Sequence, residues 1–253
     1  MIFDLQKASV WKRISAALFD SILLGILVVG LAFFFSVIFR FDSHNTALQE
    51  AYGTYEKAYG IVFEMTAEEY QNMTEEEQQV YFEAYDALIA DKDAMYHYNM
   101  VLNLTLVIAS LSILLGYILS ECVVPALLGN GQTLGKKIFG IGVMRTDGIK
   151  VTGPLMFIRT VLGKFTIETM IPVLILIMIF FNSIGVVGMF ILGLILLLQV
   201  VLLIATHTNS LIHDILAKTV VVDMASQMIF DSEQELIEYK RKIHEKQVAH
   251  QTY

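Results

Sequence analysis

Four long apolar stretches divide the chain, and polar segments of very different composition separate them. The stretches cover residues 16–39, 100–119, 165–181 and 186–205. A helix of about 20 apolar residues crosses the hydrocarbon core of a bilayer. The pattern therefore predicts an all-α polytopic membrane protein with four transmembrane helices. The first stretch is too long to be the core of a cleaved signal peptide, so we expect it to remain in the protein.

The segment between the first two predicted spans, residues 42–98, is acidic and rich in tyrosine. It contains thirteen aspartates and glutamates against two lysines. Thr66 and Thr74 are each followed three residues later by a glutamate, which is the capping-box pattern that starts a helix. We therefore expect a helical insert that faces water. With this insert as a segment of its own, we divide the chain into four segments, which are 1–41, 42–98, 99–225 and 226–253.

A short β element is predicted in the basic loop that follows the second span. Ile141 and Val143 alternate with small residues, and the Asp-Gly pair at 147–148 is a typical hairpin turn. The alternation resumes in residues 149–151, which predicts a small β-hairpin. The apolar run at 219–222 is a further strand that could pair with this hairpin.

Lysines and arginines gather in three parts of the chain, which are the N-terminus, the loop 129–164 and the tail. Four spans place these three parts on one side of the membrane and the acidic insert on the other. Because basic loops stay in the cytoplasm, we expect a multi-pass plasma-membrane protein with cytoplasmic termini and an extracytoplasmic 42–98 segment. Basic groups also attract anionic lipid headgroups, and the candidates for this contact are Lys136, Lys137, Arg145 and Lys150.

Five charged residues are predicted in or beside the spans, where a charge is costly. Each costs about 2.5–3.5 kcal/mol at the centre of a bilayer on insertion scales. Two interpretations stay open: an ion or proton site, because carboxylate oxygens suit hard cations, and a structural latch between the first span and the segment after the fourth. A single cysteine and two histidines on different helix faces predict no metal site there. The five residues are Arg13, Asp20, Glu121, Glu168 and Asp214.

Three blocks of sequence occur in an order that is typical of one family. Arg13 and Asp20 lie in the pattern R-I-x-A-x-x-x-D, residues 131–137 read GQTLGKK, and Asp214 lies in HDILAKTVV. Together they resemble the RDD family of bacterial membrane proteins. The resemblance implies a small integral membrane protein, often described as a transporter, whose defining arginine and two aspartates are Arg13, Asp20 and Asp214. It implies no substrate, and the insert 42–98 lies outside it.

These features favour a transporter, with exchange of a monovalent cation against protons at carboxylates near the cytoplasmic face. The alternative is a membrane accessory or assembly factor that presents residues 42–98 to a partner protein. A four-span bundle is thin, so a transport path favours a homodimer in the lipid bilayer. The sequence has no readable catalytic triad and no H-E-x-x-H motif, and GQTLGKK lacks the P-loop spacing. We therefore expect no enzyme activity, no cofactor and no nucleic-acid partner.

Overall fold

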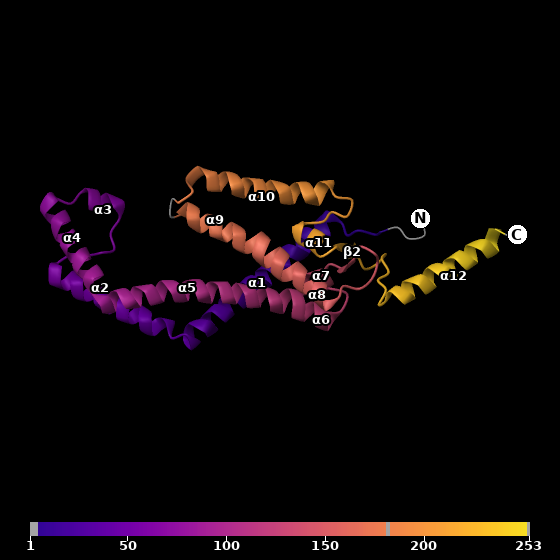
Figure 1. Cartoon of the computed structure of the whole chain (residues 1–253), viewed down its shortest axis with the longest axis horizontal. Helices are drawn as coiled ribbons and strands as arrows, with labels where there is room; N and C mark the ends of the chain where they lie inside the picture. Colours follow the sequence, from indigo (N-terminus) through magenta and orange to yellow (C-terminus); the bar gives the residue numbers. More distant parts are fainter. Residues whose placement is uncertain (1–4, 181–182, 252–253) are drawn as a thin grey trace. The chain divides into compact units, whose positions relative to one another are not determined.

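The described residues contain four helices that are long and apolar enough to cross a membrane (Figure 1). The computed structural model describes residues 5–180 and 183–251. The candidate spans in this part are Val10–Ile38, Lys92–Leu128, Gly153–Phe180 and Gly185–Ala205. A mostly helical fold with four candidate membrane spans is thus confirmed. The predicted end of the third span, Phe181, lies outside the described residues.

Two of these spans are built from several helical segments. The first span is α1 (Val10–Ile38), and the fourth is α10 (Gly185–Ala205). The second comprises α5 (Lys92–Ile118), the π-helical turn η1 (Leu119–Val123) and α6 (Val124–Leu128). The third comprises α8 (Gly153–Phe157), the π-helical segment η2 (Ile158–Met170) and α9 (Ile171–Phe180). π-Helical segments are rare in proteins, but those that occur are often found at functional sites. Both π-helical segments here carry charged residues.

The third span begins earlier than the apolar pattern predicts. The apolar stretch starts at residue 165, whereas the helix begins at Gly153. Thr152 occupies the N-cap position and Pro154 lies in the first turn, where proline is favoured because its missing N–H would have no helical partner. Arg159 and Lys164 consequently lie inside the span and not in the basic loop.

The chain divides into two compact units, and one of them holds residues 29–112. In this unit, Thr66 with Glu69 and Thr74 with Glu77 form the two predicted capping boxes. The insert is therefore helical, as its sequence predicts. Its helices, between the end of α1 and the start of α5, are α2 (Phe41–Tyr59), α3 (Ala67–Gln71) and α4 (Glu75–Ala90).

The other unit holds residues 1–28 and 113–253 and contains a small antiparallel sheet. Strand β1 (Ile141–Arg145) pairs with β2 (Thr219–Asp223). The Asp-Gly turn at 147–148 is present, but in the described part the segment after it makes a single bridge to β1, from Lys150 to Met144. The partner of β1 is thus the distant strand and not the expected second arm of a hairpin.

The start of the chain pairs with the other edge of β2. The Ala8 N–H donates to the Val221 carbonyl over 3.0 Å, and the Asp223 N–H donates to the Gln6 carbonyl over 3.1 Å. This pairing ties the segment before α1 to the segment after α10. Figure 1 also shows α9 and α10 side by side. The remaining helices of this unit are α7 (Leu134–Ile138), α11 (Ile212–Leu216) and α12 (Glu233–Gln251).

Candidate functional site

Asp214, at the third position of α11, joins four elements of the larger unit. Its carboxylate is fully buried and accepts hydrogen bonds from two arginines. Arg13 of α1 donates through Nη2 over 2.9 Å, and Arg159 of η2 donates through Nε and Nη2 over 3.1 and 3.0 Å. Thr219 of β2 adds a third donor over 3.1 Å. Burial alone would raise the pKa of Asp214, but Arg159 and the other cations around it hold that pKa well below its usual range.

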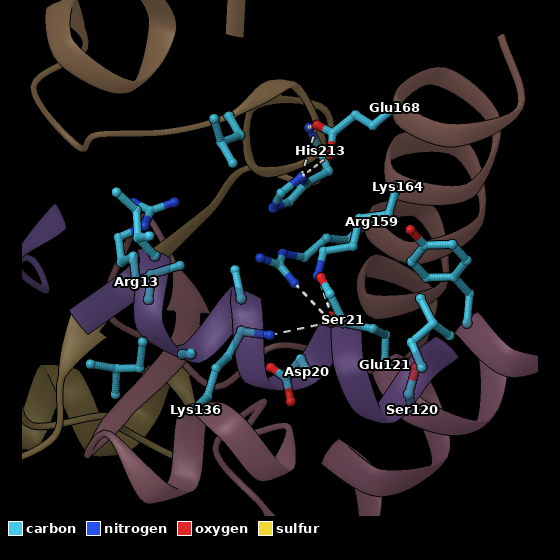
Figure 2. Close-up of a pocket in the computed structure, with 18 of the residues that line it drawn as sticks. Arg13, Asp20, Ser21, Ser120, Glu121, Lys136, Arg159, Lys164, Glu168 and His213 are labelled. Atoms are coloured by element: carbon cyan, nitrogen blue, oxygen red, sulfur yellow. Dashed lines mark hydrogen bonds and ion pairs between the residues drawn. The ribbon is translucent and has the colours of Figure 1, made fainter. Parts of the chain in front are cut away.

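Glu121, in η1, is the second acidic centre and lies among three cations (Figure 2). Lys136 of α7 donates to it over 3.2 Å, and Lys164 of η2 also donates to it. The Nη1 atom of Arg159 lies 3.6 Å from the same carboxylate. Burial lowers the pKa of Lys136 to about 8, although Glu121 opposes this shift. Glu121 therefore holds α7 against the second and third spans.

Glu168, in η2, binds His213 of α11 at two points. The carboxylate lies 2.8 Å from Nδ1 of the imidazole and accepts the backbone N–H of His213 over 3.0 Å. The other ring nitrogen, Nε2, lies 3.6 Å from Asp214. Burial lowers the pKa of His213, although Asp214 and Glu168 oppose this shift. The charged groups thus form one continuous series, which runs Glu121, Arg159, Asp214, His213, Glu168.

Asp20, in α1, differs from the other three acids because its partners are neutral. Its carboxylate accepts a hydrogen bond from the Thr133 hydroxyl and one from the Gly135 N–H over 2.8 Å. It forms no ion pair within the described part of the chain. A Cβ on Gly135 would collide with the Ala16 carbonyl and with Asp20, so only glycine allows this approach. Asp20 therefore fastens the GQTLGKK loop to the first span.

A cavity of about 260 Å³ lies among these groups. Arg159 lines this cavity. Its Nη1 atom is buried and has no hydrogen-bond partner among the described residues. Apolar side chains of the first span cover part of the wall. Figure 2 shows Lys136 and Arg159 reaching toward Glu121, and His213 lying against Glu168. The acidic and basic residues that line it are Arg13, Asp20, Glu121, Lys136, Arg159, Lys164, Glu168 and His213.

All five predicted site residues lie in this one unit. Arg13 forms an ion pair with Asp214, whereas Asp20 forms none with any residue that the structure describes. Arg159 and Lys164 are not among the predicted site residues, because the apolar stretch of the third span begins at residue 165, after both of them. The N-cap and proline signal at residues 152–154 could have corrected that boundary.

The four basic residues predicted at lipid headgroups have different environments. Lys136 is buried against Glu121, so its ammonium does not reach a membrane surface. Its neighbour Lys137 is exposed. Arg145 pairs with Asp147, and Lys150 lies 3.2 Å from Asp231. A five-residue helix turns one of two adjacent lysines inward, which explains why the expectation for Lys136 differs from its position.

The four apolar helices and the buried charge cluster define a multi-pass helical membrane protein. The chain belongs to the RDD family: the family's sequence model matches residues 7–218. The match includes Arg13, Asp20 and Asp214 and ends just before β2. Comparisons with curated proteins and with solved structures find no match.

Proposed function

We propose that this membrane protein exchanges a monovalent cation for protons, with the cavity as its binding site. The observation that carries the proposal is Asp20, a carboxylate on the cavity wall whose charge no ion pair in the described residues neutralises. Each of its oxygens has a lone pair left for a ligand, and carboxylate oxygens are suitable ligands for hard cations. Ionisable groups inside a membrane bundle are typical of ion and proton pathways.

Lys136 is the proposed proton carrier of the exchange. Its pKa of about 8 places its charge change close to physiological pH, and it interacts electrostatically with Asp20. The other charges that face it are Glu121 from the second span and Lys164 and Arg159 from the third. A protonated ammonium opposes a cation at Asp20, and a neutral amine does not. Binding of the cation therefore favours release of the proton.

Everted vesicles that contain a pH-sensitive dye test this proposal. We expect Na⁺, Li⁺ or K⁺ to dissipate a preformed proton gradient with the wild type and not with Asp20→Asn. Lys136→Met should abolish proton coupling, whereas Lys137→Met, an exposed neighbour, should leave it intact. Asp20→Glu keeps the charge and should shift the cation concentration for half-maximal exchange. Equal dye signals from wild type and Asp20→Asn would contradict the proposal.

The proposed setting is the plasma membrane, with both termini in the cytoplasm and the insert outside. The distribution of lysine and arginine supports this orientation. Lys137, Arg145 and Lys150 remain proposed contacts for anionic headgroups, and a homodimer remains the proposed assembly because four spans make a thin bundle. The proposed activity is transport and not catalysis.

A second candidate function is that of an accessory or assembly factor. It is favoured by one observation: residues 29–112 form a compact unit of their own. A variant in which a short linker replaces residues 42–98 separates the two functions. Retained cation exchange supports the transporter, whereas loss of a co-purifying partner, with no cation-dependent dye signal from either the variant or the wild type, supports the accessory role.

A further inference from the structure

Two histidines from different helices of the unit 29–112 face each other through the same ring atom. His44 lies in α2 and His97 lies near the start of α5, and their Nδ1 atoms are 3.1 Å apart. The ring centroids are 5.2 Å apart, and the rings are tilted by 47°. Tyr96 contacts both imidazoles, at 5.8 and 5.2 Å between centroids. Both histidines are half-buried, so packing limits the positions their rings adopt.

The separation of the two nitrogens is that of neighbouring ligands on a transition metal. Zinc–imidazole bonds of about 2.0–2.1 Å place two tetrahedral ligands about 3.3 Å apart. A square-planar arrangement at similar bond lengths brings them to about 2.8–2.9 Å. The observed 3.1 Å lies between these values. When the ring that donates this hydrogen bond moves its proton to Nε2 through solvent, both Nδ1 atoms present lone pairs. A small rotation of either ring then lets one metal ion bind between them.

We propose that His44 and His97 form a two-imidazole site for a divalent transition metal, such as Cu²⁺, Ni²⁺ or Zn²⁺. Neutral imidazole suits these ions, and copper should bind most tightly among them. The insert carries thirteen acids against two lysines, and this charge raises the local concentration of cations. The described residues contain no cluster of three or more histidine, cysteine or acidic ligands. Water therefore completes the coordination, and the metal exchanges readily.

A bound metal would join α2 to α5 through two side chains that are 53 residues apart in the sequence. The site is separate from the cavity, because both ligands belong to the unit 29–112 and every cavity residue belongs to the other unit. It is independent of the proposed cation exchange, and a failure of either proposal leaves the other standing.

Metal titration of the purified full-length protein, without a histidine tag, tests the site. We expect one Cu²⁺ per chain, with an electron paramagnetic resonance spectrum that shows coupling to two imidazole nitrogens. His44→Gln and His97→Gln should each weaken binding by at least about tenfold. His244→Gln, in the exposed part of α12, is the matched control and should bind like the wild type.

Two results would overturn the proposal. One is unchanged copper affinity in both His44→Gln and His97→Gln. The other is a wild-type spectrum without two coupled nitrogens, which would leave the pair as a shared proton only. The spectrum is recorded on the unmodified protein, so this outcome holds even if a variant folds poorly.

Discussion

The Asp214 carboxylate links α11 to three other elements, so its loss would remove contacts to α1, η2 and β2 together. It is fully buried and compensates Arg13 and Arg159 together. Removal of one partner of a buried pair leaves an uncompensated charge, at a cost of about 3–5 kcal/mol. We expect Asp214→Asn to lower the free energy of unfolding by that amount, as thermal unfolding in detergent can measure.

The control for this substitution is Asp223→Asn. Asp223 pairs with Lys12 over 2.6 Å, but the Lys12 side chain is 43% exposed. Exposed pairs contribute about 0–1 kcal/mol because solvent screens them. Equal losses for the two variants would contradict the central role of Asp214.

Lys136 gives the unfolding free energy a particular dependence on pH. Its pKa falls from 10.5 in the unfolded chain to about 8 in the folded protein. Between these values the unfolded state binds more protons, so stability rises with pH. We expect the wild type to gain stability relative to Lys136→Met as the pH rises from 8 to about 10, as unfolding at a series of pH values can measure. Lys137→Met should retain the wild-type slope, and a pH-independent difference for Lys136→Met would refute this assignment.

The sequence predicts some of the site at the residue scale. Arg13 and Asp214 are unusual beside apolar helices, because a charged side chain costs free energy inside a bilayer, and this makes them recognisable as site residues. The partners of Asp20 could not be predicted, because a hydroxyl and a backbone N–H carry no unusual sequence signal. The inward turn of Lys136 is equally hidden, since five helical residues are too few for a period to be read.

At the scale of elements, the approach of α11 to η2 depends on Gly163. A Cβ at this position would overlap Cα and Cβ of His213. We expect Gly163→Ala to push α11 away and to destabilise the protein by about 1–3 kcal/mol, as overpacked sites do. Thermal unfolding measures this loss.

The matched control is Gly193→Ala in α10. No atom lies within 4 Å of a Cβ built at Gly193, and alanine is the better helix former. This substitution should be neutral or slightly stabilising. A Gly163→Ala variant as stable as Gly193→Ala would show that α11 and η2 do not pack this closely.

Element starts were readable where a cap marks them, as at Thr66 and Thr74. Strand pairing was harder to predict, because the local Asp-Gly turn favours a hairpin and the actual partner of β1 lies beyond the fourth span. β1 pairs with β2 and not with residues 149–151, because this pairing buries Val220, Val221 and Val222. β2 lies between β1 and the N-terminal segment. Apolar burial therefore outweighs the local turn signal.

At the scale of the whole molecule, the proposed orientation predicts which side of the membrane each segment reaches. In a Cys122→Ser background, Glu83→Cys should react with a membrane-impermeant maleimide in intact cells, because residue 83 belongs to the acidic insert. Ser232→Cys should react only after the membrane is opened. Both positions are exposed. Labelling of both in intact cells, or of neither, would contradict an orientation with cytoplasmic termini.

The pairing of the chain start with its late segments has a consequence for synthesis. Arg13 is made early, and its carboxylate partner follows 201 residues later, after the last span. Arg159 also waits for Asp214. An unpaired guanidinium remains near water or headgroups, since its transfer into the bilayer is costly. The first helix can therefore take its final depth only after the ribosome has released α11, so the bundle is completed late in synthesis and not when the first helix inserts.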